Sequence, residues 1–311
     1  MDNKIIDLSV IIPVYKSENI LWKLSSELTK TISNMTINYE VIFVSDASPD
    51  NSFKVIKLIC ENNSNFKGIQ LRNNIGQHRS VIVGMGFASG KYVITMDDDL
   101  QHSPTYIPEL LDKIKLGYDV VYCSFNSKSH SVWKIMGSRV VDYIMVKALN
   151  KPKELYLSPY RVLTIEVCKE IVKSQNKNSY IDVLILKITD NISSINGIHF
   201  KRNHGKSNYN LRKSILLFLK MITGFTVYPL RLVTSLGLII FFVSFLLILL
   251  LIVNRLLNNN TPIEWSSLIV TIIFLSGAQL VGIRLLGEYL GRIFSSTDSK
   301  PIFSIKEKVG L

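Results

Sequence analysis

Short apolar runs alternate with amphipathic segments through the first 125 residues of the chain. The runs are typical of buried strands, because they are nearly continuous in apolar residues and bounded by polar ones. They cover 8–15, 39–45, 68–72, 92–96 and 119–125. Segments with helical spacing lie between them, at 18–33, 51–62, 77–89 and 104–116. This alternation predicts an α/β domain with a mostly parallel sheet covered by helices on both faces.

The pattern changes in the last third of the chain. No charged residue occurs between Arg231 and Arg255 or between Glu264 and Arg284. Each run exceeds the roughly 18 residues that indicate a membrane-spanning helix. Two helices buried in a soluble core are the alternative, but the first run is apolar on every face. Basic residues flank the outer ends of the two runs, so the sequence predicts a transmembrane hairpin with both chain termini in the cytoplasm.

These patterns divide the chain into four parts. We expect a cytoplasmic domain over 1–210, two transmembrane helices over 229–290 and a cytoplasmic carboxyl-terminal tail over 291–311. Basic residues alternate with leucines in 211–228, which predicts an amphipathic helix in the membrane interface or a linker packed on protein.

Charge and cysteine content change this interpretation little. The formal net charge is +12, which an anionic membrane surface and phosphorylated substrates explain without a nucleic-acid partner. The three cysteines are scattered without metal-ligand spacing, as expected for reduced thiols of a cytosolic domain. We find neither a P-loop nor GxGxxG after the first strand, which disfavours ATPases and dinucleotide-binding enzymes.

Polar residues gather where the predicted strands end, and ligands of such sheets bind at the carboxyl ends of strands. The sequence "MDDDLQH" places Asp97, Asp98 and Asp99 directly after the fourth strand. Adjacent carboxylates are costly unless they are paired or hold a metal. Because magnesium is commonly bound by one or two carboxylates together with substrate phosphates, this segment predicts a metal site next to a phosphate.

Several motifs occur together and in one order. They are "LSVIIPVYKSE", "YEVIFVSDASPD", "NNIGQH", "ASGKYVITMDDDLQHSP", "GYDVVY", "GKSNY" and "LLGEYLGRIF". With them the chain resembles the family 2 glycosyltransferases, which have the Rossmann-like GT-A fold. Within that family it is similar to the polyprenyl-phosphate glycosyltransferases, which include dolichol-phosphate mannosyltransferase-like enzymes. The resemblance extends to bacterial membrane-hairpin enzymes that transfer glucose or aminoarabinose to undecaprenyl phosphate.

The resemblance implies roles for individual residues. It implies that Asp97 and Asp99 act in catalysis and bind Mg²⁺ or Mn²⁺ together with Gln101, and that Arg161 is also catalytic. The residues implied to bind the nucleotide sugar are Pro13, Tyr15, Asp46, Asp98, Arg202 and Ser207. Ser138 and Arg139 are implied to lie near the acceptor phosphate.

The implied activity is metal-dependent, inverting transfer of a sugar from a nucleotide-sugar donor to undecaprenyl, or another polyprenyl, phosphate. It would take place at the cytoplasmic face of the bacterial inner membrane. The alternatives are the same donor chemistry on another lipid or lipid-linked glycan, and a non-catalytic membrane partner in glycolipid translocation. The sequence determines neither the sugar nor the nucleotide nor the oligomeric state, although relatives assemble as tetramers.

The chain also departs from the family pattern. Ser158 and Pro159 stand where relatives often have Gly-Asp before the arginine, and Phe125 stands where an arginine is common. Ser45 and Ala47 replace the usual Asp and Gly around the aspartate of the second strand. A hydroxyl acceptor would need a general base, whereas a phosphate monoester, with a second pKa near 6, is already largely anionic at neutral pH. The departures therefore favour a lipid phosphate as the acceptor.

Overall fold

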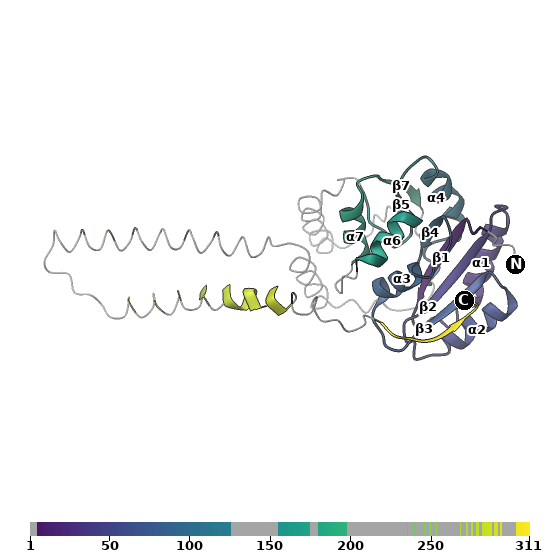
Figure 1. Ribbon diagram of the computed structural model, residues 1–311, viewed down its shortest axis with the longest axis horizontal. Coiled ribbons are helices and arrows are strands. Elements are labelled where there is room, and N and C mark those ends of the chain that lie inside the picture. The colour runs from purple at the N-terminus through teal and green to yellow at the C-terminus, as the bar shows by residue number, and fades with distance from the viewer. Residues whose placement is uncertain are drawn as a thin grey trace. The chain divides into compact units, whose positions relative to one another are not determined.

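The computed structural model describes residues 5–125, 155–174, 180–197 and 303–311, together with single residues and short stretches between 235 and 293. The chain divides into two compact units, Met1–Ser207 with Lys300–Leu311, and Asn208–Ser299. Every strand of the described chain belongs to the first unit, which Figure 1 shows as a sheet with its covering helices.

The first unit is built on an eight-stranded sheet of order β7-β5-β6-β4-β1-β2-β3-β8. Parallel pairing joins β4 to β1, β1 to β2, β2 to β3 and β5 to β7. Two strands run antiparallel to their neighbours: β6 lies between β4 and β5, and β8 lies beside β3. The strands are β1 (Leu8–Val14), β2 (Tyr39–Ser45), β3 (Phe66–Leu71), β4 (Tyr92–Thr95), β5 (Val120–Phe125), β6 (Arg161–Thr164), β7 (Ile192–Gly197) and β8 (Ile305–Val309).

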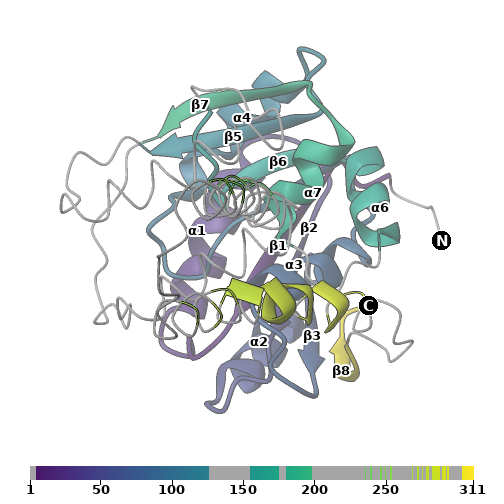
Figure 2. The ribbon, with the colours of Figure 1, turned by 90° about the vertical axis from the view of Figure 1, so that its left-hand side faces the viewer.

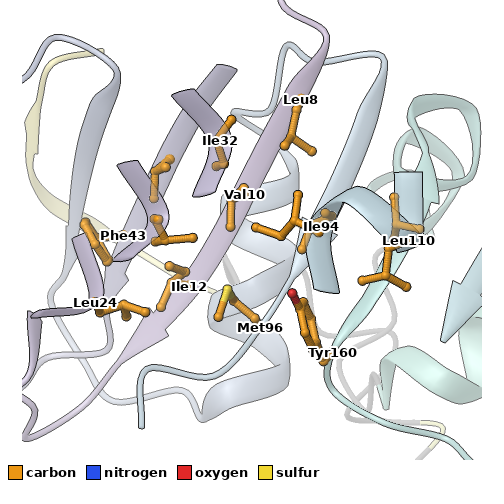
Figure 3. Close-up of a cluster of buried hydrophobic side chains, with 14 of the residues drawn as sticks. Leu8, Val10, Ile12, Leu24, Ile32, Phe43, Ile94, Met96, Leu110 and Tyr160 are labelled. Atoms are coloured by element: carbon orange, nitrogen blue, oxygen red, sulfur yellow. The ribbon is translucent and has the colours of Figure 1, made fainter. Parts of the chain in front are cut away.

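Helices cover both faces of the sheet because apolar residues of the strands point alternately to either side. One buried cluster joins α1, α2 and α4 to the sheet, and Figure 3 shows part of it around β1. A second cluster joins α3, α6 and α7 to the opposite face. The helices are α1 (Leu21–Ser33), α2 (Ser52–Asn62), α3 (Gln77–Met85), the 3₁₀ turn η1 (Pro104–Tyr106), α4 (Ile107–Ile114), α6 (Ile165–Lys173) and α7 (Ile181–Ile188).

The mostly parallel sheet and its two helical layers confirm the prediction for the first 125 residues, where predicted and observed ends differ by a few residues. The sequence did not reveal β6, which has four residues and begins two residues after Pro159. Its pairing with strands far away in the sequence, rather than its own pattern, makes it a strand.

The last residues of the chain, within the predicted tail over 291–311, pair with the sheet of the first unit. Lys300–Leu311 belongs to the first unit, and Ile305–Val309 extends the sheet along β3. A strand of five residues with three charges has too weak an apolar pattern to be recognised without its partner.

The predicted segment 211–228 and most of the predicted hairpin over 229–290 lie outside the described residues. Among the residues that are described, no helix is both long enough and apolar enough to cross a membrane.

Candidate active site

Loops that follow β1, β2, β3 and β4 meet at the carboxyl edge of the parallel strands. Hydrogen bonds between side chains and backbone tie these loops together in pairs. The predicted carboxylates lie at the junctions, so the structure brings Asp46 and the Asp97–Asp99 segment to one edge of the sheet as the sequence predicted.

Asp46 joins the loop after β2 to the loop after β3. One carboxylate oxygen accepts the backbone N–H of Ile75 at 2.8 Å, and the other accepts that of Gly76 at 2.9 Å. Gly76 has a φ of 89°, a left-handed conformation that glycine adopts without strain. Asp46 is only 3% exposed and both of its oxygens accept hydrogen bonds, so it organises this loop. Its implied contact with the nucleobase stays a prediction.

Asp98 joins the loop after β1 to the loop after β4. Its Oδ2 accepts the backbone N–H of Tyr15 at 3.3 Å and the hydroxyl of Ser17. Burial raises the pKa of Asp98 to about 6, although the hydrogen bonds from Ser17 and Tyr15 oppose that shift. The carboxylate is thus directed toward the β1 loop, where Tyr15 is 47% exposed and available to a ligand.

Asp97 lies beside the first turn of α3. Gln77 donates a hydrogen bond from its side-chain amide to Oδ1 of Asp97. Burial and the charges of Asp99 and Asp98 raise the pKa of Asp97 to about 7, against the opposing effect of Arg161. Sequence reasoning did not assign Gln77 a role, although it lies within the "NNIGQH" motif.

The residues present fit a divalent cation. Three consecutive carboxylates lie together and are partly buried. Burial raises the pKa values of Asp97 and Asp98, and the charges of neighbouring carboxylates raise that of Asp97 further, which a bound cation would relieve. Asp99 accepts the backbone N–H of Gln101 at 3.1 Å, which places that residue against the carboxylate cluster. Within the described residues, no group of three or more His, Cys, Asp and Glu side chains has the arrangement of a complete metal site. The predicted site requires fewer protein ligands, because substrate phosphate supplies the other ligands of the metal.

The side chain of Arg161 is buried and not accessible to a ligand from solvent. It is 2% exposed, and its guanidinium forms an ion pair with Asp182 at the start of α7. Its Nε donates to Oγ1 of Thr95 at 3.2 Å, and Tyr122 donates to the same Asp182 oxygen at 3.0 Å. The charge of Arg161 acts on Asp97 through space and lowers its pKa. Its implied catalytic role stays a prediction, and this geometry favours an indirect one.

Asp182 is a partner that the sequence did not indicate. It lies in an apolar helical segment, "IDVLILKI", and is part of none of the sequence motifs. Its function as the counter-ion of Arg161 follows only from the fold, which packs α7 against the sheet. The acid absent from the Ser158–Pro159 segment is therefore not needed to pair with Arg161.

The residues that differ from the family pattern have defined conformations and contacts in the structure. Ala47 has a φ of 49°, which explains why glycine is common there. The Pro159 carbonyl accepts the Thr95 hydroxyl at 2.7 Å, and Ser158 Oγ accepts the Tyr160 backbone N–H at 3.1 Å. The ring of Phe125 stacks on His102 with centroids 4.7 Å apart. Ser158 and Phe125 are buried, so these replacements are packed within the domain.

The structure does not place all predicted residues. Pro13 is buried within β1, paired with Val44 of β2. Four of the predicted residues lie outside the described part of the chain, namely Ser138, Arg139, Arg202 and Ser207. The described part of the site therefore comprises the carboxylate cluster and the loops around it.

Comparison with known proteins agrees with this geometry. Residues 9–171 match the family model described as glycosyl transferase family 2. The chain is 32% identical to undecaprenyl-phosphate 4-deoxy-4-formamido-L-arabinose transferase of Serratia proteamaculans, over 97% of this chain and 94% of that protein. It is also 32% identical to the protein of that name in Proteus mirabilis, over 99% of this chain and 95% of that protein.

The fold also matches a solved structure. Glucosyl-3-phosphoglycerate synthase from Mycobacterium tuberculosis, crystallised with Mn²⁺, uridine diphosphate and phosphoglyceric acid, superposes with a TM-score of 0.51 at 14% identity. The match covers 70% of this chain and 76% of that one. The family model covers the strands and loops that form the carboxylate edge, and the relatives align along almost the whole chain. This protein belongs to glycosyl transferase family 2.

Proposed function

We propose that the protein is a metal-dependent, inverting glycosyltransferase that moves a sugar from a nucleotide-sugar donor to undecaprenyl or another polyprenyl phosphate. The observation that carries this proposal is the Asp97–Asp99 cluster, three consecutive carboxylates that hydrogen bonds connect to the loops at the carboxyl edge of a family 2 fold. The acceptor class is supported by relatives named for transfer to undecaprenyl phosphate, which align along almost the whole chain.

The donor side of the reaction requires a cation. Asp97, Asp99 and Gln101 would hold Mg²⁺ or Mn²⁺, as the solved structure with bound Mn²⁺ suggests. Bound there, the metal would offset the charge that develops on the departing nucleoside diphosphate. The chain itself contributes alignment, because Asp46, Asp98 and Gln77 fix the four loops that surround the donor.

The acceptor side is consistent with a phosphate nucleophile. His78 is next to Gln77 at the start of α3, but burial lowers its pKa to about 4, far below the value that suits a general base at neutral pH. A phosphate monoester is largely ionised at that pH and needs no such base. Ser138 and Arg139 are proposed to lie near this phosphate, and Arg202 and Ser207 near the donor.

A polyprenyl acceptor presents its phosphate at the membrane surface. We propose that the two apolar runs within 229–290 form a membrane hairpin in the bacterial inner membrane, with 211–228 in the interface. The first unit would then lie on the cytoplasmic side, which the basic residues outside the two runs favour.

Mass spectrometry of the lipid product tests the proposal directly. Purified full-length protein in detergent is incubated with undecaprenyl phosphate, Mg²⁺ or Mn²⁺ and a panel of nucleotide sugars. We expect a sugar-shifted lipid phosphate that disappears with a chelator and with Asp99→Asn, while circular dichroism shows that the variant is folded. Activity on a glycerolipid or a lipid-linked glycan instead would overturn the acceptor assignment. A fully active Asp99→Asn variant would exclude Asp99 as a metal ligand. The absence of any product from the folded intact protein, with every donor and acceptor, would indicate a non-catalytic membrane partner.

A further inference from the structure

The carboxyl-terminal strand β8 lies against β3, the strand that leads into the loop around Asp46. Figure 2 shows β8 at the edge of the sheet beside β3, far from β7 at the other edge. The pairs are antiparallel and run from Gly68 with Val309 to Leu71 with Ile305. The end of the protein chain thus borders the strand that supports the active-site loop.

A β-bulge lets side chains of β8 pack against the helices on both faces of the sheet. Between Gln70 and Leu71 the register shifts, and Lys306 is the additional residue on β8. The shift turns neighbouring side chains to opposite faces. As a result Val309 packs with the cluster of α1, α2 and α4, whereas Ile305 packs with the cluster of α3, α6 and α7.

Polar contacts add to this anchoring on each face. Glu307 forms an ion pair with Lys57 of α2 at 2.5 Å. On the other face the ammonium of Lys308 lies 4.5 Å from the ring centroid of Phe87, which follows α3. Both contacts are partly exposed, so the apolar anchors and the strand pairing contribute most of the docking energy.

Hydrogen bonding continues from β8 into the loop after β3. The backbone N–H of Arg72 donates to the carbonyl of Ser304 at 2.9 Å. A few residues later, Ile75 and Gly76 donate to Asp46, and Gln77 donates to Asp97. The segment 72–77 is therefore held at its start by β8 and at its end by the two carboxylates.

We propose that β8 is a positioning element of the nucleotide site, which holds 72–77 in the conformation that reaches Asp46 and Asp97. A loop fixed at one end only would lose the ordering that these hydrogen bonds require, since fixing each residue costs conformational entropy. Coupling between two sites is reciprocal, so nucleotide binding must also stabilise the docking of β8. This inference rests on the proposed function only in assuming that a nucleotide binds at this edge.

Hydrogen exchange on the intact protein tests the coupling. With uridine diphosphate and Mn²⁺ as the probe, we expect the amides of 305–309 to exchange about tenfold more slowly at saturation, as linkage predicts for ligand well above its Kd. The amides of β7, at the opposite edge of the sheet, serve as the control and should not change. Protection of 72–77 without protection of β8 would overturn the inference.

A pair of variants separates positioning from general stability. Ile305→Thr with Val309→Thr removes both apolar anchors while keeping β-branched side chains in the strand. We expect the Kd of the Mn²⁺–uridine diphosphate probe to rise about tenfold and kcat to change less. Lys306→Thr introduces the same residue at the exposed bulge and should leave the Kd unchanged.

The outcomes distinguish this inference from the proposed function. Probe binding to the intact chain with an unchanged Kd in the folded double variant would contradict the role of β8. Failure of the probe and of every other nucleoside diphosphate to bind the intact chain would contradict the proposed donor site itself. If the double variant does not fold, hydrogen exchange on the intact chain decides the question alone.

Discussion

Two acidic sites at opposite ends of the same strands differ in how completely they are paired. At the amino ends of β1, β2 and β3, Glu40 is fully buried and accepts from the Ser9 hydroxyl at 2.5 Å and the Ser89 N–H at 2.7 Å. Lys67 completes the set with an ion pair to Glu40 at 2.6 Å. Each oxygen of this carboxylate has a partner supplied by the protein.

At the carboxyl ends, Asp97 has Gln77 as its neutral partner and two further carboxylates as neighbours. Backbone strain is concentrated there too. Among the described residues, four that are not glycine have a positive φ, and three of them lie in loops at this edge: Lys16, Ala47 and Leu100. Such strain is typical of functional sites, where the surrounding structure holds an unfavourable conformation.

The comparison distinguishes an acid that the protein itself pairs completely from acids that have other carboxylates as neighbours. The charge of Glu40 is compensated within the protein by an ion pair and two hydrogen bonds, so this carboxylate needs no cation. A cluster with repelling neighbours lowers stability and is relieved by a cation. Substitutions at the two ends should therefore have opposite effects on activity and on stability.

The largest expected effect is the loss of activity in Asp97→Asn. Removing one of the carboxylates proposed to bind the metal should reduce turnover about 10³-fold, because a metal at this position would contribute several kcal/mol to stabilising the transition state. The asparagine side chain can still accept the hydrogen bond from Gln77, so the fold should be retained. Radiolabelled sugar transfer to lipid measures the activity. Transfer within tenfold of the unmodified protein would place the metal elsewhere.

Glu40→Gln should have the opposite consequence. The amide would face the Lys67 ammonium, and we expect the free energy of unfolding to fall by about 2 to 3 kcal/mol, as when one partner of a buried ion pair is removed. Urea denaturation measures the loss. Activity per folded molecule should stay unchanged, and a tenfold decrease would show that the two ends are coupled.

A smaller effect is expected from pH in the absence of metal. The pKa of Asp97 is raised to about 7 in the fold, whereas an unfolded aspartate has a pKa near 3.9. The folded state therefore binds more protons between roughly pH 4 and pH 7, so the free energy of unfolding falls as pH rises through that window. The pKa of Asp98 is also raised, so this residue too lowers the free energy of unfolding as pH rises. The charge of Asp99 raises the pKa of Asp97, and the charge of Arg161 lowers it.

Thermal denaturation in chelator at pH 5 and pH 8 measures this dependence. We expect Tm to fall by a few degrees in this range, a shift typical of 1 to 2 kcal/mol in a domain of this size. Mg²⁺ or Mn²⁺ at pH 8 should restore it by mass action. The decrease should be smaller in Asp97→Asn, and an identical decrease in both proteins would assign it to other groups.

Ala47→Gly should have the smallest effect. Glycine removes the cost of the left-handed backbone, about 1 to 2 kcal/mol, but orders a more flexible residue on folding. We expect a net gain of about 0.5 kcal/mol, detectable as a higher urea midpoint. A loss of stability would mean that the methyl group of Ala47 makes a packing contact that outweighs the strain.

Local sequence patterns were sufficient to predict the strands and helices in the first 125 residues of the domain. The strands from β1 to β5 carry apolar runs that stand out from their neighbours, and "MDDDLQH" follows one of them directly. Sequence reasoning failed for β6, β7 and β8, which are short and become strands by pairing with β4, β5 and β3. It also missed Gln77 and Asp182, because their importance depends on which side chains the fold brings next to them.

The sequence by itself determined the class of fold and the edge of the sheet at which the carboxylates of the predicted site lie, since each is a feature of residues close together in the chain. Only the tertiary structure decided the partners of those residues. It placed Arg161 in a buried pair with Asp182, and it brought the last residues of the chain beside the loop that reaches Asp46. Contacts between residues far apart in sequence form when the whole core packs, so no local pattern encodes them.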